Sequence, residues 1–211
     1  EEIDIIFLCN PNNPTGLLIE KPLLEKILKR CRERNILMAV DECFLDFVQD
    51  SETYTLKEYL DTYDNLFLLK AFTKRYAMAG VRLGYGISEN AELLEKMTMA
   101  TQPWNISVMA QAAGIAALKE NEYVENGRQM VFEESKYLRE KLQEFGMEVF
   151  PSEANYIFFK GPENLFEKCV KHGVLIRDCS NYFGLKKGYY RVAVRTHEEN
   201  EKLIQSMQEE A

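Results

Sequence analysis

The stretch IDIIFLCNPNNPTG, residues 3–16, decides the fold of the first half of the chain. Residues 3–9 are almost all apolar, and a short apolar run of this kind is typical of a buried strand. Asn, Pro, Thr and Gly then fill residues 10–16, and Asn, Pro and Gly favour tight turns. We therefore predict a strand over residues 3–9 that ends in a tight polar loop. A plain turn without a chemical role is the alternative for the loop.

The same order, a buried strand and then a polar cluster, recurs further along the chain. We predict strands over residues 36–40, 66–69 and 81–86, with a helix over residues 22–34 after the first strand. Pro22 suits the first turn of that helix. Strands that alternate with helices form a mostly parallel sheet covered on both faces. Ligands bind such sheets at the carboxyl ends of the strands, where Asp41 and Lys74 follow two of the predicted strands.

The second half of the chain has a different pattern. Helices are predicted over residues 91–101, 107–119, 123–145, 165–172 and 198–207, and short strands over residues 147–150, 156–159, 174–177 and 189–194. These elements form an α+β unit that follows a long connecting helix. We predict an α/β protein with one domain over residues 1–120 and a smaller C-terminal α+β domain over residues 121–211.

Composition excludes several classes of protein. The chain has 211 residues with 26 Lys and Arg against 34 Asp and Glu, a net charge of −8, which argues against binding to nucleic acid. No apolar run approaches the ~20 residues that span a bilayer, and no signal-peptide pattern is seen. The five scattered cysteines form no CxxC pair and there are only two histidines, so we expect no metal site. We expect a cytoplasmic protein with buried, reduced thiols.

Four side chains could carry chemistry, and each has a plain structural alternative. Asp41 follows a buried strand, where a carboxylate is costly unless it is paired, but it could also begin a solvated loop. Lys74 taken alone is an ordinary surface lysine. Arg191 and Arg195 are four residues apart, which would place both on one face of a strand, and that face could simply be solvated.

Taken together, these residues form an ordered set of motifs. The set is NPNNPTG at residues 10–16, then Asp41-Glu42, then FTK at residues 72–74 with GVRLGY at residues 80–85, and then Tyr190-Arg191. The combination resembles the class I/II aminotransferases of fold type I, which depend on pyridoxal 5'-phosphate (PLP). The resemblance runs over essentially the whole chain. It implies part of a large PLP-binding domain with a mostly parallel sheet, a C-terminal small domain, and a homodimer.

The resemblance also implies a role for each residue that matches a cofactor-binding motif. Lys74 would bind PLP covalently and move protons. Asp41 would keep the pyridine nitrogen protonated. Asn13 would donate a hydrogen bond to the phenolic oxygen, and Thr73 and Arg82 would hold the phosphate.

Substrate binding is implied for a second set of residues. Arg191 matches the arginine that holds the substrate α-carboxylate. Arg177 and Arg195 are candidates for a further anionic group, with Asn155 as a neutral partner. An ion pair between Arg177 and Asp178 or another carboxylate is the alternative for Arg177.

Within the family the chain looks most like the histidinol-phosphate aminotransferase group, and inside it like the decarboxylases of threonine phosphate. The residues that carry this likeness are DECFLDF at 41–47, QPWN at 102–105, LIRDCSNY at 175–182 and Arg195-Thr196. The likeness implies decarboxylation of L-threonine O-3-phosphate to (R)-1-aminopropan-2-yl phosphate in cobalamin biosynthesis. The alternatives are a histidinol-phosphate or other class I/II aminotransferase, and a non-catalytic module like those fused to transcription regulators.

Two features depart from the family pattern. Phe44 stands where the family usually has a tyrosine that donates to the phenolic oxygen. The part of the family that precedes the Asn-Pro loop, including the loop that cradles the phosphate, has no counterpart in the chain. We therefore expect the chain to be the C-terminal part of a longer protein.

Overall fold

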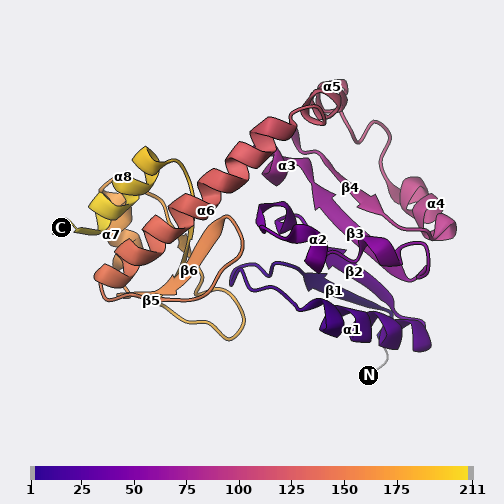
Figure 1. Ribbon diagram of the computed structural model, residues 1–211, viewed down its shortest axis with the longest axis horizontal. Helices are drawn as coiled ribbons and strands as arrows, with labels where there is room; N and C mark the ends of the chain where they lie inside the picture. Colours follow the sequence, from indigo (N-terminus) through magenta and orange to yellow (C-terminus); the bar gives the residue numbers. More distant parts are fainter. Residues whose placement is uncertain (1–2, 209–211) are drawn as a thin grey trace. The chain divides into compact units, whose positions relative to one another are not determined.

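The computed structural model describes residues 3–208, which form two compact units (Figure 1). Unit 1 contains residues 3–11 and Leu18–Glu125, and unit 2 contains Asn12–Leu17 and residues 126–208. The long helix α6, Asn121–Glu144, runs from one unit into the other. The domain limits predicted at residues 120 and 121 stay a prediction, but the loop Asn12–Leu17 packs with unit 2 although it follows the first strand.

Unit 1 is built on a four-stranded sheet in the order β1-β2-β3-β4. The strands are β1 (Ile5–Cys9), β2 (Leu37–Asp41), β3 (Leu66–Ala71) and β4 (Gly84–Ile87). The first three are parallel, and β4 runs antiparallel to β3. The prediction of a mostly parallel sheet is confirmed, with strand ends displaced by a few residues. The largest displacement is at β4, because Ala79–Val81 form a 3₁₀ turn before the strand.

Helices and turns cover one face of this sheet. Helix α1 (Lys21–Glu33) has Pro22 in its first turn, as predicted, and it buries Leu24 and Leu28 in the main core of the unit. Two short 3₁₀ turns (Leu45–Phe47 and Lys57–Tyr59) and two single-turn helices, α2 (Ser51–Tyr54) and α3 (Phe72–Arg75), were not predicted. They are too short to show a helical period. Helices α4 (Ala91–Ala100) and α5 (Val108–Ala117) agree with the prediction.

The two faces of the sheet differ in exposure. Met38, Val40, Leu66 and Leu68 point to one face and are fully buried in the core. Alternate residues point to the other face, where the exposed fractions of Ile5, Phe7 and Leu69 are 41%, 73% and 40%. That second face therefore presents apolar side chains to solvent in the part of the chain that the structure describes, and the prediction that both faces are covered is wrong for these residues.

Unit 2 contains a second four-stranded sheet, in the order β5-β6-β8-β7, in which every neighbouring pair is antiparallel. The strands are β5 (Glu148–Val149), β6 (Tyr156–Lys160), β7 (Arg177–Asp178) and β8 (Tyr189–Ala193), and the helices are α7 (Leu165–Lys171) and α8 (His197–Gln208). Strand β7 starts at the last residue of the strand predicted over residues 174–177. Its short length follows from the turn that Cys179 and Tyr182 close directly after it.

The loop after β1 is fixed at both of its ends. In unit 1 the buried Asn10 side chain accepts a hydrogen bond from the Ile19 amide at 2.8 Å and donates to the Tyr54 carbonyl at 3.3 Å. In unit 2 the Tyr156 hydroxyl donates to the Asn12 carbonyl at 2.9 Å. Gly16 has a φ of +73°, which favours glycine. The predicted tight loop is thus an ordered part of unit 2 from Asn12 onward.

Three of the five cysteines, Cys31, Cys169 and Cys179, are buried as predicted. Cys9, the last residue of β1, and Cys43, in the loop after β2, are half-buried. Among residues 3–208, no helix combines the length and the apolar character that a membrane crossing requires. No group of three or more His, Cys, Asp or Glu side chains in that same range could hold a metal ion.

Candidate functional site

Asp41 ends β2 on the half-exposed face of the sheet in unit 1. Its register partners are Cys9 in β1 and Leu69 in β3. Its Oδ1 accepts a hydrogen bond from the Cys43 amide at 2.9 Å, and it makes no ion pair with any residue between 3 and 208. Its carboxylate therefore remains available to a cationic ligand group.

Lys74 lies in the single-turn helix α3 that follows β3 directly. Its side chain is exposed, and Nζ lies 5.3 Å from the centre of the Phe44 ring. No carboxylate within the described residues pairs with it. The thiol of Cys43 is close to both functional groups. Burial, then a hydrogen bond and the charge of Asp41, raise its pKa to about 12, while the positive charges of Lys70 and Lys74 oppose this shift.

Thr73 and Arg82 flank Lys74 in the same unit. Thr73 is half-buried beside it in α3. Arg82 is exposed, has a φ of +58°, and donates from Nη1 to the carbonyl of Ala79 at 3.1 Å. Arg82 has no carboxylate partner in residues 3–208. The Thr73 hydroxyl and the other guanidinium nitrogens of Arg82 can therefore donate to an anion.

Sequence reasoning missed the acidic and basic residues that surround Lys74. Glu42 is fully buried and its Oε2 lies 2.8 Å from Lys70 Nζ. Asp46 pairs with Arg75, whose Nε also donates to the Tyr76 hydroxyl at 3.2 Å. The signal was present in the motif DECFLDF at residues 41–47, but only the fold pairs Glu42 with Lys70 and Asp46 with Arg75.

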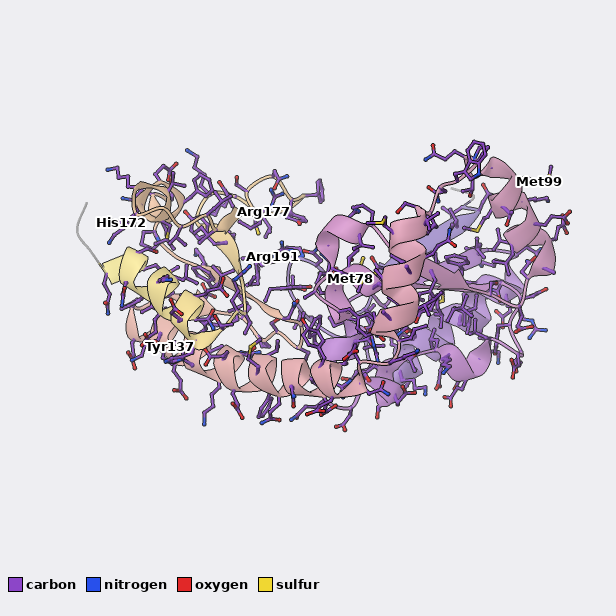
Figure 2. All side chains as sticks on the ribbon, turned by 90° about the horizontal axis from the view of Figure 1, so that it is seen from above. Met78, Met99, Tyr137, His172, Arg177 and Arg191 are labelled. Carbon is purple, nitrogen blue, oxygen red and sulfur yellow. The ribbon has the colours of Figure 1, made fainter. Side chains whose placement is uncertain are left out.

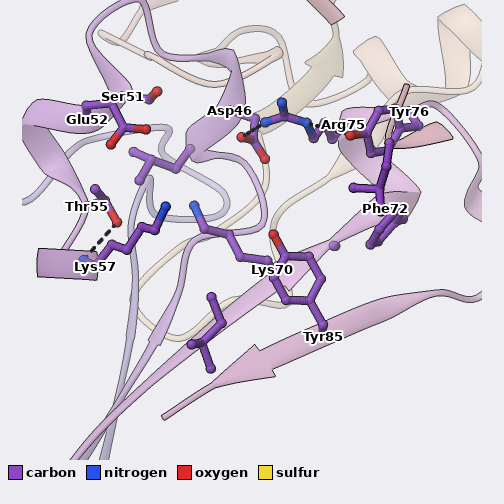
Figure 3. A pocket seen from close by; sticks show the side chains of 14 residues that line it. Asp46, Ser51, Glu52, Thr55, Lys57, Lys70, Phe72, Arg75, Tyr76 and Tyr85 are labelled. Atoms are coloured by element: carbon purple, nitrogen blue, oxygen red, sulfur yellow. Dashed lines mark hydrogen bonds and ion pairs between the residues drawn. The ribbon is translucent and has the colours of Figure 1, made fainter. Parts of the chain in front are cut away.

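A cavity of about 310 Å³ lies beside these ion pairs in unit 1 (Figure 3). Lys57 and Lys70 point into it, and Asp46, Arg75 and Tyr85 contribute to its wall. Neither Asp41 nor Lys74 lines it. Lys70 points to the face of the sheet opposite to Asp41. The cavity is therefore separate from the predicted cofactor site.

In unit 2, Arg191 lies in the centre of the sheet. It donates from Nη1 to Oδ1 of Asn13, and its guanidinium lies 5.0 Å from the centre of the Tyr156 ring. Thus the structure brings together Arg191 and Asn13, which are separated by most of the chain. It leaves the Asn13 side-chain oxygen engaged and its amide nitrogen available as a donor.

Arg177 stands directly opposite Arg191 in the pairing of β7 with β8 (Figure 2). Like charges at directly opposite positions destabilise a sheet. Arg177 donates to the side chain of Asn181 at 3.1 Å and its guanidinium lies 5.8 Å from the Tyr182 ring. Neither arginine has a carboxylate partner in the described part of the chain, so the expected alternative of an Arg177–Asp178 ion pair is wrong. Asp178 instead accepts from the Ser180 amide.

Arg195 does not join this pair. Strand β8 ends at Ala193, so the prediction that Arg191 and Arg195 share one strand face is wrong. Arg195 is exposed and forms an ion pair with Glu199 at 2.8 Å, because the chain turns there into helix α8. Asn155 contributes its carbonyl to the Val194 amide at 2.9 Å, and no described contact directs its side chain to either arginine.

The residues of unit 1 have the donor set that PLP requires. The cofactor carries a phosphate, an aldehyde and a pyridine nitrogen. Thr73 and Arg82 can donate to an anion, the exposed Lys74 amine can react with an aldehyde, and the unpaired Asp41 can accept from a protonated ring nitrogen. The arrangement fits the cofactor that the resemblance implies.

Comparison with known proteins identifies the family. The sequence pattern of the family described as aminotransferase class I and II matches residues 1–207. The chain belongs to this family. Its members depend on PLP, and the predictions of family and fold are confirmed.

Individual relatives and solved structures agree with this assignment. The chain is 35% identical to threonine-phosphate decarboxylase of Salmonella typhimurium, over 98% of the chain and 57% of that protein. It is 32% identical to histidinol-phosphate aminotransferase of Methanosphaera stadtmanae, over 99% of the chain and 57% of that protein. The crystal structure of histidinol-phosphate aminotransferase from Clostridium acetobutylicum superimposes with a TM-score of 0.91 at 32% identity, covering 97% of the chain and 63% of the other. The chain thus spans less than two thirds of the length of these relatives.

Proposed function

We propose that the chain belongs to a cytoplasmic, PLP-dependent enzyme that decarboxylates L-threonine O-3-phosphate to (R)-1-aminopropan-2-yl phosphate, a step of cobalamin biosynthesis. The observation that carries the proposal is the pair Arg177 and Arg191, directly opposite one another without a carboxylate partner in residues 3–208. A substrate with a carboxylate and a phosphate supplies the anions that such a pair needs. Each charge-assisted hydrogen bond contributes about 1.5–3 kcal/mol.

Lys74, Asp41, Asn13, Thr73 and Arg82 are proposed to bind the cofactor. Bound PLP would supply an electron sink for the substrate bond that is broken. Asp41 supports this by holding a proton on the pyridine nitrogen. Once the bond between the α-carbon and the carboxylate has broken and CO₂ has left, Lys74 Nζ can deliver a proton to the α-carbon.

Arg177 and Arg191 are proposed to hold the substrate by its two anionic groups. Two contacts at separate points fix the rotation of the substrate, and the rotation decides whether the carboxylate or the α-hydrogen is removed. Arg195 and Asn155 are also proposed to contact the substrate, and Arg195 would first have to leave Glu199.

A histidinol-phosphate or other class I/II aminotransferase is the second candidate, since its substrate can also carry a phosphate ester. Relatives with both names match the chain at similar identity. Phe44 favours the decarboxylase, because the aminotransferases of the group mostly carry tyrosine there. The likeness at residues 175–182 points the same way.

The test is a direct comparison of the two reactions with the full gene product. We expect release of CO₂ from L-threonine O-3-phosphate and little formation of keto acid from histidinol phosphate with 2-oxoglutarate. Fast transamination without CO₂ release would establish the second candidate instead. Light scattering on the same preparation tests the proposed homodimer.

A further inference from the structure

Two ion pairs join the segment after Asp41 to the segment that carries Lys74. Glu42 pairs with Lys70 at 2.8 Å, and Asp46 pairs with Arg75. Both acids come from residues 42–46 and both bases from residues 70–75. Lys74 lies between the two bases in the sequence, so it is anchored on both sides.

The first of these pairs is rigid because Glu42 is completely buried. Its carboxylate accepts from the Thr55 hydroxyl at 2.9 and 3.0 Å, from the Leu56 amide at 3.2 Å, and from Lys70. A buried carboxylate is tolerated only when it is neutralised and hydrogen-bonded in this way. Removing one partner from such a pair leaves an uncompensated charge, so the arrangement tolerates little displacement.

The second ion pair, between Asp46 and Arg75, holds the other end of the segment 42–46. Asp46 lies in the 3₁₀ turn Leu45–Phe47, and Arg75 is the last residue of α3. Phe44 stands between the two acids, with its ring 5.3 Å from Lys74 Nζ. The two pairs therefore hold Phe44 against Lys74 while Asp41, directly before Glu42, ends the neighbouring strand.

We propose that Glu42 and Asp46 are positioning residues: through Lys70 and Arg75 they fix Lys74 relative to Asp41 and Phe44. The inference rests on the proposed PLP chemistry, in which the amine and the carboxylate act on one cofactor. A displacement of 1 Å in such an arrangement can lower a rate about 100-fold. Lys70 and Arg75 are each held in an ion pair, whereas no carboxylate in the described residues pairs with Lys74.

The experiment uses the full gene product and the variants Glu42→Gln and Asp46→Asn. Glu33→Gln is the matched control, because it removes an exposed ion pair with Arg30 in the same unit. Three quantities are measured: kcat and KM, the pH midpoint of the visible band of bound PLP, and amide hydrogen exchange of the cofactor-free protein over residues 42–47 and 70–76.

We expect each variant to lower kcat by about 10- to 100-fold while KM changes far less, and to shift the pH midpoint of the band. Exchange should rise in both segments, and Asp46→Glu should restore kcat. The control should change none of these. If Glu42→Gln fails to fold, Asp46→Asn alone provides the test, because the Asp46 side chain is partly exposed to solvent.

Normal kcat and unchanged exchange in a folded Asp46→Asn protein would overturn the inference. A wild-type protein without a visible PLP band would instead refute the proposed function. In that case the exchange of the variants still tests the positioning role. Exchange at residues 70–76 that is no faster in Asp46→Asn than in the wild type would overturn this role, and faster exchange would support it.

Discussion

Replacement of Gly16 by alanine tests the packing of the loop that carries Asn13. A Cβ atom at Gly16 would lie 1.9 Å from Ser152 Oγ, 2.6 Å from Ser152 Cβ and 2.9 Å from Ser152 Cα. Ser152 cannot simply rotate away, because its hydroxyl donates to the Tyr156 carbonyl at 2.6 Å and its Cα belongs to the backbone. The segment around residue 16 must therefore shift.

The expected loss of stability in Gly16→Ala has two parts. A φ of +73° costs a non-glycine residue about 1–2 kcal/mol, and forcing an extra carbon into a packed site costs about 1–3 kcal/mol. We expect Gly16→Ala to lower the free energy of unfolding by about 2–5 kcal/mol in total. This is a large part of the ~5–15 kcal/mol that stabilises a typical domain.

Gly146 provides a matched control in the same unit. Its φ is also +73°, but no atom lies within 4 Å of the position that its Cβ would take. Gly146→Ala therefore carries the backbone cost alone, and both variants change the unfolded chain equally. Urea unfolding followed by circular dichroism measures the two. If Gly16→Ala costs no more than Gly146→Ala, the described packing of Gly16 on Ser152 is wrong.

Three further predictions concern the residues of unit 1. Borohydride reduction of the PLP-loaded protein followed by peptide mapping should place the label on Lys74, and a label on Lys70 would end the assignment. Asp41→Asn should remain folded by circular dichroism and lose about 10²–10⁴ in turnover, so near-normal turnover would refute its role. Cys43 should stay protonated up to a pH near its raised pKa of about 12, and iodoacetamide should therefore label it slowly at pH 8. Because Asp41 contributes to that shift, Asp41→Asn should lower the pKa of Cys43 and speed the labelling, and an unchanged rate would contradict the contact.

The longer regular elements could be predicted from the sequence, although the ends of several strands differ by a few residues. Strands β1, β2 and β3 are apolar runs, and Asp41 and Lys74 follow two of them, so the edge of the sheet could be inferred before any coordinates. The single-turn helix that holds Lys74 could not, because four residues are too few to show a period.

Pairings between distant segments were beyond sequence reasoning for a physical reason. Arg195 was placed beside Arg191 by extending the strand period, but the chain leaves the sheet after Ala193. The true neighbour, Arg177, depends on the register of β7 against β8. Likewise, the contact of Arg191 with Asn13 requires that the loop after β1 pack with unit 2.

The exposed face of the first sheet has a consequence for handling the protein. Ile5, Phe7 and Leu69 present apolar side chains there, and in the described residues β1 has no partner along its outer edge. Flat apolar surfaces beside an open strand edge attract one another and can extend into shared sheets. In a preparation of these 211 residues alone, the apparent molar mass from light scattering should therefore rise with concentration, and charged substitutions at Phe7 should raise its solubility limit.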